Sequence, residues 1–234
     1  MFMVLDLNLK SEMSNYLLHI ETATKVCSVA ISDNGVVLSL KEASEDAYIH
    51  SESLTLFIEA VLVEAGITLN DLSAISVSAG PGSYTGLRIG LSTAKGLCFA
   101  LNIPLISIDT LDALYHLIEN NALNIIPLLD ARRMEVYAKV YASNGEILEE
   151  LDAVILNETS FSSFEPFIVL GDGASKCKEL WQGRNIVWKE TLLSSAAGQA
   201  KLAYQKFNEK AFENLAYFVP IYLKDANGVR RNAS

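Results

Sequence analysis

One glycine-rich segment of this sequence has a composition that could bind a phosphate. It runs from Gly80 to Gly90 as GPGSYTGLRIG, between a predicted strand over 72–78 and a predicted helix over 83–101. Glycine permits positive φ angles and close backbone approach, and N–H groups at a helix N-terminus bind anions. No Gly-Lys-Ser/Thr follows as in a Walker loop, and Gly86 comes one residue late for a dinucleotide fingerprint. A phosphate cradle that includes Gly82 and a tight structural turn therefore both remain open.

Two carboxylates follow predicted strands, where such groups often meet magnesium or a substrate. Glu21 ends one strand and Asp130 another, although each could equally cap a nearby turn. The three histidines (His19, His50 and His116) are too far apart in sequence to form an HxxxH or HExxH metal pair. We therefore predict no catalytic residue and no metal ligand, and the two carboxylates stay candidates for nucleotide contact only.

Composition and charge argue against several classes of protein. Half of the 234 residues are apolar and the net charge is −10. A protein that binds nucleic acid alone usually has a basic face, but the longest basic clusters here are two arginine pairs, 132–133 and 230–231. No apolar run approaches the roughly 20 residues of a membrane-spanning helix, and residues 1–15 do not resemble a signal peptide. We expect a cytoplasmic protein whose widely spaced cysteines are reduced core residues: Cys27, Cys98 and Cys177.

The order of predicted elements indicates a duplicated α/β fold with mixed sheets flanked by helices. The first half has strands over 16–20, 26–31, 36–40 and 72–78, helices over 48–65 and 83–101, and a strand ending at residue 108. The second half begins with a helix to about 119. It continues with strands over 125–129, 134–141, 146–155, 167–170 and 186–188, a helical segment to about 181 and a helix over 195–207. We predict subdomains over 16–108 and 109–224, with tails at 1–15 and 225–234.

The two helices of the first half each carry two apolar stripes, whereas a surface helix needs only one. The second stripes consist of Leu56, Ala60 and Val63 in one helix and Ile89, Thr93, Gly96 and Ala100 in the next. These stripes either meet other parts of the same domain or form an interface, and we favour dimerisation through the two helices.

Five segments together resemble the TsaB (YeaZ) family: residues 19–24 (HIETAT), 50–52 (HSE), 80–90, 130–133 (DARR) and 220–224 (PIYLK). The resemblance covers about residues 16–224, and Met13 is the expected true start. It implies the two-lobed actin/Hsp70/sugar-kinase fold, which is ribonuclease H-like. It also implies a heterodimer with the catalytic homologue TsaD, a complex that includes the ATPase TsaE, and transfer of threonylcarbamoyl to adenosine 37 of tRNA.

The resemblance also implies that this chain is non-catalytic. The catalytic relative carries a His-x-x-x-His metal pair where this chain has Thr110 and Leu114, which are poor ligands for a transition metal. Many relatives have Asp where this chain has Glu21. We therefore expect a scaffold subunit that forms a homodimer alone, has no cofactor of its own, and contacts tRNA only indirectly. ATP and magnesium are expected only within the complex. The alternatives are a small-molecule kinase or ATPase of the same fold, or a glycoprotease-like peptidase.

Overall fold

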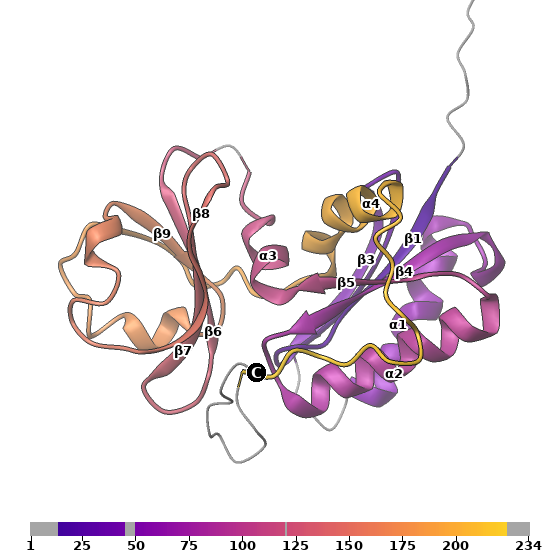
Figure 1. Cartoon of the computed structure of the whole chain (residues 1–234), viewed down its shortest axis with the longest axis horizontal. Coiled ribbons are helices and arrows are strands. Elements are labelled where there is room, and N and C mark those ends of the chain that lie inside the picture. Colours follow the sequence, from indigo (N-terminus) through magenta and orange to yellow (C-terminus); the bar gives the residue numbers. More distant parts are fainter. Residues whose placement is uncertain (1–13, 45–49, 120, 224–234) are drawn as a thin grey trace, which may run out of the picture.

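The computed structural model describes residues 14–44, 50–119 and 121–223, apart from the side chains of residues 50–52. These residues form two lobes, each built on one five-stranded sheet (Figure 1). The expected tails at 1–15 and 225–234 lie almost wholly outside the described residues. Within the described ranges, no helix combines the length and the apolar character needed to cross a membrane.

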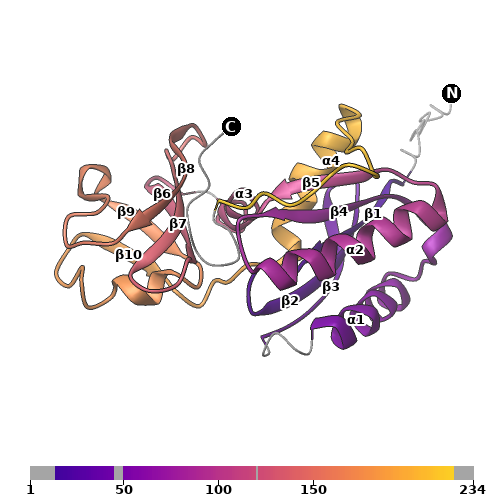
Figure 2. The same ribbon diagram turned by 60° about the horizontal axis from the view of Figure 1, so that its bottom comes forward.

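The first lobe contains strands β1 (Tyr16–Glu21), β2 (Val26–Asp33), β3 (Val36–Ser44), β4 (Leu72–Gly80) and β5 (Leu105–Asp109), with helices α1 (His50–Ala65) and α2 (Tyr84–Leu101). The sheet order is β3-β2-β1-β4-β5. The pairs β1–β2 and β2–β3 are antiparallel, whereas β1–β4 and β4–β5 are parallel. Helices α1 and α2 lie side by side on one face of this sheet (Figure 2).

The second lobe repeats this arrangement. It contains β6 (Asn124–Asp130), β7 (Glu135–Tyr141), β8 (Ile147–Ile155), β9 (Phe167–Leu170) and β10 (Ile186–Lys189), in the order β8-β7-β6-β9-β10. Here too the first three strands pair antiparallel and the last two join in parallel. The two sheets therefore have the same order and the same strand directions, which confirms the predicted duplicated α/β fold.

Local sequence explains where several elements begin and end. The hairpin between β2 and β3 turns at Asn34 and Gly35, whose φ angles of 48° and 82° are ones that Asn and Gly adopt readily. Helix α2 starts because the Ser83 side chain accepts a hydrogen bond from the Gly86 N–H, as an N-cap does. It ends at Asn102, which takes the left-handed conformation.

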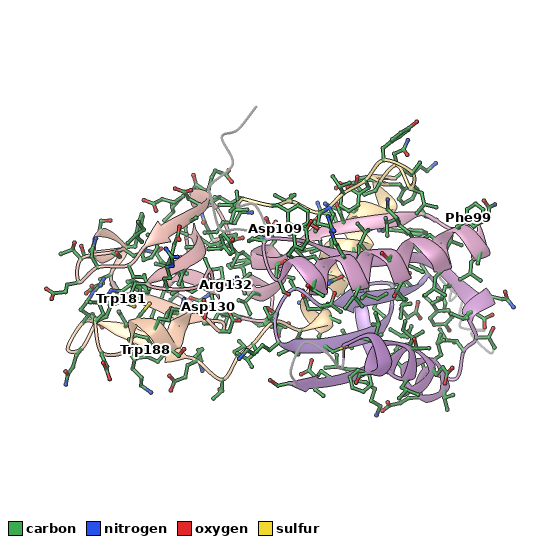
Figure 3. All side chains as sticks on the ribbon, turned by 90° about the horizontal axis from the view of Figure 1, so that it is seen from below. Phe99, Asp109, Asp130, Arg132, Trp181 and Trp188 are labelled. Carbon is green, nitrogen blue, oxygen red and sulfur yellow. The ribbon has the colours of Figure 1, made fainter. Side chains whose placement is uncertain are left out.

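The strands of the first sheet have apolar residues on both faces, so both faces are covered. One face packs on α1 and α2 through buried residues that include Leu18, Ile20, Leu54 and Leu91. The opposite face buries Leu17, Ala74, Ile106, Ile108, Ala113 and Ala203. The second lobe has its own core around Trp181, which packs edge-on against Phe161 and Phe167 and lies near Trp188 (Figure 3).

The chain returns to the first lobe after β10, which corrects the predicted boundary of the second subdomain. The 3₁₀ turn η4 (Ala196–Gln199) and helix α4 (Ala200–Asn208) pack on the face of the first sheet opposite α1 and α2 (Figure 1). Farther on, the Glu213 N–H donates to Leu105 O, and the Ile221 N–H donates to Ala79 O. Residues 196–223 were assigned to the second subdomain because they follow it in sequence, but their packing places them on the first.

Two predicted helices are shorter than expected. The segment after β5 forms α3 (Thr110–Tyr115), which Asp109 caps at its N-terminus, and then continues past His116 only as three-residue turns. The segment predicted to be helical up to residue 181 contains only the 3₁₀ turn η3 (Ala174–Cys177). The carbonyls of Gly173, Ser175 and Cys177 accept hydrogen bonds from the N–H groups of Lys176, Lys178 and Trp181, which form turns rather than a regular helix. Two further 3₁₀ turns are η1 (Leu69–Asp71) and η2 (Ser162–Phe164).

Candidate functional site

The glycine-rich segment packs directly on the loop that follows β1. A side chain at Gly82 would meet the backbone of Ala23, and one at Gly86 or Gly90 would meet Thr22. Gly86 and Gly90 lie four residues apart, on one face of the helix. The Thr22 hydroxyl donates to Gly86 O at 2.8 Å, and the Ser83 N–H donates to Ala23 O at 2.6 Å. The glycines thus allow α2 to approach this loop closely, which favours the structural-turn alternative over a phosphate cradle.

The C-terminal motif covers the other side of the same turn. Ile221 N–H donates to Ala79 O at 2.7 Å, and any side chain at Gly80 would meet Ile221 O. The Tyr222 ring lies 4.9 Å from that of Tyr84, while the Arg88 guanidinium lies 4.0 Å above the Tyr84 ring. Residues 79–90 are therefore enclosed between the loop after β1 and the C-terminal segment, two parts of the chain that carry motifs of the family.

Glu21 is fully buried rather than open to a ligand. Its Oε1 accepts the Ala23 N–H at 2.7 Å, and its Oε2 accepts the Ser78 hydroxyl. Burial raises the pKa of this carboxyl, although the bonds from Ser78 and Ala23 act in the opposite direction. Gln199, on the returning segment, donates through Nε2 to Ser78 Oγ at 3.1 Å and to Ile20 O at 3.0 Å. Glu21 thus belongs to a buried network that ties η4 to the first sheet.

His19 continues this network through the sheet. Its two ring nitrogens lie 2.7 Å from Ser76 Oγ and 2.7 Å from Ser32 Oγ, and the Ser76 hydroxyl also donates to Gln199 Oε1 at 2.6 Å. Complete burial lowers the pKa of His19 to about 3, so its ring is neutral near pH 7. The sequence reading of His19 as a packed residue agrees with this position.

Asp130, the second candidate carboxylate, lies at the end of β6 in the second lobe. Lys176 Nζ lies 2.5 Å from its Oδ1, and the same oxygen accepts the Arg132 N–H at 2.6 Å. Its own N–H donates to Asp172 Oδ1 at 2.9 Å. Glu21 and Gly82 lie near each other because both contact Ala23. The contacts of Asp130 given above are all with residues of the second lobe. This arrangement does not fit a magnesium–nucleotide site, because one acid is buried and bonded and the other is paired and caps a turn.

The positions where the catalytic relative has its histidine pair are part of the packing here. Leu114 is fully buried in the core of the second sheet, beside Gly171, and Thr110 is buried as the first residue of α3. His116, the C-cap residue of α3, donates through Nδ1 to Asp112 O at 2.9 Å. The side chain of His50 lies outside the described residues. Across the described ranges, no group of three or more His, Cys, Asp and Glu side chains could hold a metal ion.

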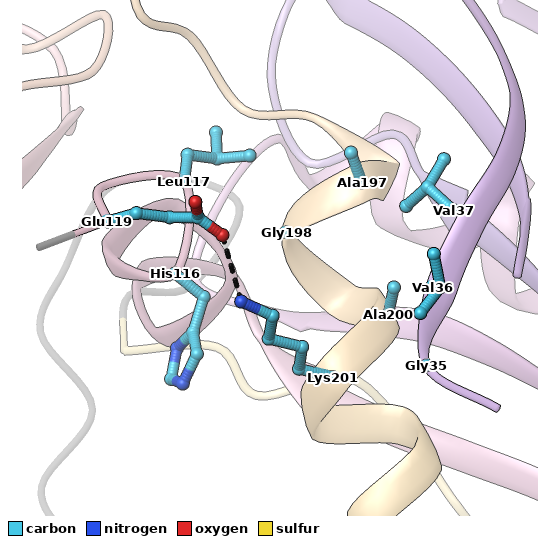
Figure 4. A pocket seen from close by; sticks show the side chains of 10 residues that line it. All are labelled: Gly35, Val36, Val37, His116, Leu117, Glu119, Ala197, Gly198, Ala200 and Lys201. Atoms are coloured by element: carbon cyan, nitrogen blue, oxygen red, sulfur yellow. Dashed lines mark hydrogen bonds and ion pairs between the residues drawn. The ribbon is translucent and has the colours of Figure 1, made fainter.

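A pocket of about 330 Å³ lies where α3, the β2–β3 turn and α4 meet (Figure 4). Its walls are mostly apolar, and the Glu119–Lys201 ion pair, 2.9 Å long, crosses one side. The lining residues are Gly35, Val36, Val37, His116, Leu117, Glu119, Ala197, Gly198, Ala200 and Lys201. None of the candidate nucleotide residues lines this pocket, so the pocket and the glycine-rich turn are separate features.

The outer face of α1 and α2 carries exposed apolar side chains. Leu56 is 63% exposed, Val63 81% and Phe99 81%, and Gly96 and Ala100 lie beside Phe99 on the exposed side of α2. Ala60 and Thr93 are half-buried. We refer to Leu56, Ala60, Val63, Thr93, Gly96, Phe99 and Ala100 as the docking face.

One residue of the predicted stripe also packs against the core, and one exposed residue was missed. Ile89 is half-buried and packs partly against the core cluster that α1 and α2 cover, so we leave it out of the docking face. Phe99 was not in either predicted stripe, although it is among the most exposed apolar side chains described. Its position three residues after Gly96 is the helical spacing that could have identified it.

This chain has two lobes whose sheets share the same strand order, and a glycine-rich turn leads into α2 beside the buried, hydrogen-bonded Glu21. These features define the class of actin-like proteins related to TsaD. The family model of TsaD, a tRNA N6-adenosine threonylcarbamoyltransferase, matches residues 42–230. The ethanolamine utilization protein EutJ of Carboxydothermus hydrogenoformans shares the fold alone, at a TM-score of 0.51 and 11% identity over 80% of this chain and 89% of EutJ.

More similar relatives identify the branch. The tRNA threonylcarbamoyladenosine biosynthesis protein TsaB of Escherichia coli is 29% identical over 89% of this chain and 94% of its own length. The protein of the same name from Buchnera aphidicola is 31% identical over 71% and 82%. YeaZ from Pseudomonas aeruginosa has a TM-score of 0.77 and 25% identity, covering 89% of this chain and 100% of that one. This chain belongs to the TsaB (YeaZ) family.

Proposed function

We propose that this chain is a non-catalytic cytosolic subunit of the machinery that makes threonylcarbamoyladenosine on tRNA. In this role it supports a TsaD homologue, which transfers threonylcarbamoyl to adenosine 37. The docking face carries the proposal, because it exposes large apolar side chains on two adjacent helices while the candidate acids are occupied by other residues. The names of the similar TsaB proteins and the match to the TsaD family model support the same pathway.

The chemistry of the docking face suits contact with other helices. Phe99, Val63 and Leu56 supply apolar area, and burying each contributes about 1.5–3 kcal/mol. Gly96 and Ala100 are small, so a partner helix can approach α2 closely. A second copy of this chain and a TsaD homologue would use the same surface. The homodimer and the heterodimer are therefore mutually exclusive, and TsaD should dissociate the homodimer.

Other components of the complex reach this chain indirectly in the proposal. The ATPase TsaE and tRNA bind mainly to TsaD. ATP and magnesium bind only within the assembled complex and not to the isolated chain. The burial of Glu21 and the Asp130–Lys176 pair support this division of roles, since neither acid is free to organise magnesium.

Charge placed on the docking face tests the proposal. Val63→Glu combined with Phe99→Glu should abolish co-purification with TsaD and convert the homodimer to a monomer in size-exclusion chromatography. Ala60→Glu or Gly96→Arg should weaken both contacts. Val187→Glu is the matched control, because Val187 is also an exposed apolar residue but lies on β10 of the other lobe. An intact TsaD complex with the Val63/Phe99 double variant would reject the docking face.

Complex formation alone does not establish the role, so modification must be measured as well. Reconstituted threonylcarbamoylation of tRNA should require this chain and should be lost with the Val63/Phe99 double variant but not with Val187→Glu. Full activity of TsaD in the absence of this chain would contradict the proposed supporting role.

A further inference from the structure

A network of buried hydrogen bonds joins the returning segment to the first sheet. Gln199 stands in the middle of this network, although it belongs to η4 and not to the sheet. Each of the six polar side chains in the network is at most 1% exposed: His19, Glu21, Ser32, Ser76, Ser78 and Gln199. Because these groups are shielded from solvent, each donor and each acceptor needs a partner inside the protein.

The carbonyl of Ile20 fixes the orientation of the Gln199 amide. A carbonyl oxygen can only accept, so the amide nitrogen, Nε2, must be the atom that lies 3.0 Å from Ile20 O. The same nitrogen lies 3.1 Å from Ser78 Oγ, and it has a proton for each of the two contacts. The amide oxygen then faces the Ser76 hydroxyl at 2.6 Å and accepts its proton. The two ends of the amide therefore cannot be exchanged.

This orientation determines which ring nitrogen of His19 carries a proton. The Ser76 hydroxyl gives its single proton to Gln199, so its oxygen can only accept from His19. His19 Nδ1, which lies 2.7 Å from Ser76 Oγ, must therefore donate. The ring is neutral near neutral pH because complete burial lowers its pKa to about 3. Nε2 thus has no proton and accepts the Ser32 hydroxyl at 2.7 Å. We call this series of bonds the His19 arm.

The network has a second arm, which ends at Glu21. Ser78 Oγ accepts a proton from Gln199, so the proton of the Ser78 hydroxyl is left for Glu21 Oε2. The other oxygen of Glu21 accepts the Ala23 N–H at 2.7 Å. We call this series the Glu21 arm. Both arms begin at the one amide of Gln199, and the direction of each bond follows from that amide.

We propose that Gln199 is a latch that closes the first lobe, and that its amide imposes the Nδ1–H tautomer on His19. Without Gln199, the Ser76 hydroxyl could turn its proton toward Nδ1, and His19 could then carry its own proton on Nε2. With the amide in place, only one arrangement of protons gives every group a partner. The tautomer of His19 therefore reports whether the latch is closed.

The position of the latch explains why its closure concerns both lobes. The neighbouring Gly198 packs so closely against α3 that a side chain there would meet Ala113 O. The 3₁₀ turn η4 is thus held between α3 and the first sheet. Withdrawal of Gln199 would leave the Ile20 carbonyl without its donor and Ser76 without its acceptor, and such buried unpaired groups oppose partial opening.

NMR spectroscopy of the full chain measures the tautomer directly. In a ¹⁵N-labelled chain near neutral pH, long-range correlations from the ring C–H protons distinguish a protonated ring nitrogen from an unprotonated one. The signals of His19 are those that His19→Gln removes. We expect a single tautomer with the proton on Nδ1. A proton on Nε2, a charged ring or an equal mixture of tautomers would overturn the proposal.

Gln199→Met tests whether the amide sets the tautomer. Methionine keeps an unbranched side chain of similar length but has no amide. We expect His19 to show a second tautomer with Nε2 protonated, although Gln199 is bonded to it only through Ser76. The backbone amides of α4 should exchange with solvent about 100-fold faster, the effect of leaving two buried polar groups without partners. An unchanged tautomer in the folded variant would refute the role of Gln199.

Two control variants separate the latch from a general loss of stability. Ser78→Ala interrupts the Glu21 arm and leaves the His19 arm intact, so the tautomer should not change. Gln205→Met makes the same substitution at an exposed position of α4 and should change neither the tautomer nor the exchange rates. A second tautomer in either control would assign the change to loosening of the lobe and overturn the proposal. If Gln199→Met does not fold, the tautomer of the parent chain decides.

Discussion

Alanine at two glycines of α2 should have opposite effects on stability. At Gly86 a methyl group would meet the backbone carbonyl of Thr22, which cannot move without shifting the loop after β1. Overpacking of this kind costs about 2–3 kcal/mol, more than the gain in helix propensity at the first turn. At Gly96 no heavy atom lies within 4 Å of the added carbon. Gly96→Ala therefore retains the propensity gain of about 1 kcal/mol that alanine has over glycine inside a helix.

Thermal unfolding measures the difference directly. In a chain of this length a change of 1 kcal/mol shifts Tm by about 2–4 °C, so Gly96→Ala should raise Tm by about 3 °C. Gly86→Ala should lower it by about 6 °C on the same scale. Both are measured at a concentration at which size-exclusion chromatography shows a monomer, because Gly96 belongs to the docking face. A change of the same sign in both variants would refute close packing as the reason for the glycine spacing.

Of three other predictions, two concern buried polar groups and one concerns nucleotide binding. Because the pKa of His19 falls from 6.5 in the unfolded chain to about 3 in the fold, stability should decrease as pH falls from 6.5 toward 3. The slope is about 1.4 kcal/mol per pH unit, and His19→Gln should remove that part of it in urea titrations at several pH values. Lys139→Ala should cost about 3 kcal/mol in urea unfolding, because the buried Lys139 lies 2.7 Å from Asp112 and 3.5 Å from Asp109. Lys201→Ala, which breaks an exposed pair, is the control and should cost less than about 0.5 kcal/mol; equal effects would contradict the role of burial. Calorimetry of the isolated chain with ATP and magnesium should give only heats of dilution, and micromolar binding would favour the kinase or ATPase alternative.

Local patterns in the sequence predicted most of the elements. Alternating and continuous apolar runs located all ten described strands, and Asn34-Gly35 identified the first hairpin because that pair adopts positive φ angles readily. The 3.6-residue periodicity placed Leu54 and Leu91 on the core stripes and Leu56 and Val63 on a second stripe, and the structure buries the first two and exposes the others. These features depend on neighbours within a few residues, which periodicity can detect.

Contacts between distant residues could not be predicted in the same way. Gln199 bonds to Ser78 across 121 positions of sequence, and no periodic pattern records such a partner. The same limit explains why residues 196–223 were assigned to the wrong lobe. Ile89 lies on the predicted second stripe and also packs partly against the core, a contact that helical periodicity does not record. The roles of Glu21 and Asp130 depended on Ser78 and Lys176, both far away in sequence.

The return of the chain to the first lobe makes the second lobe an insertion, entered after Asp109 and left before Ala196. During synthesis from the N-terminus, β1 to β5 leave the ribosome early, but Ala203 and Phe207, which cover Leu17 and Ile106, emerge only after the whole second lobe. One apolar face of the first sheet therefore stays uncovered while nearly a hundred residues are translated. The second lobe has its own core around Trp181, so it can fold before the first is complete. The nascent chain should thus depend on chaperones until its final segment closes the first lobe, and truncation after β10 should yield a folded second lobe attached to an aggregation-prone sheet.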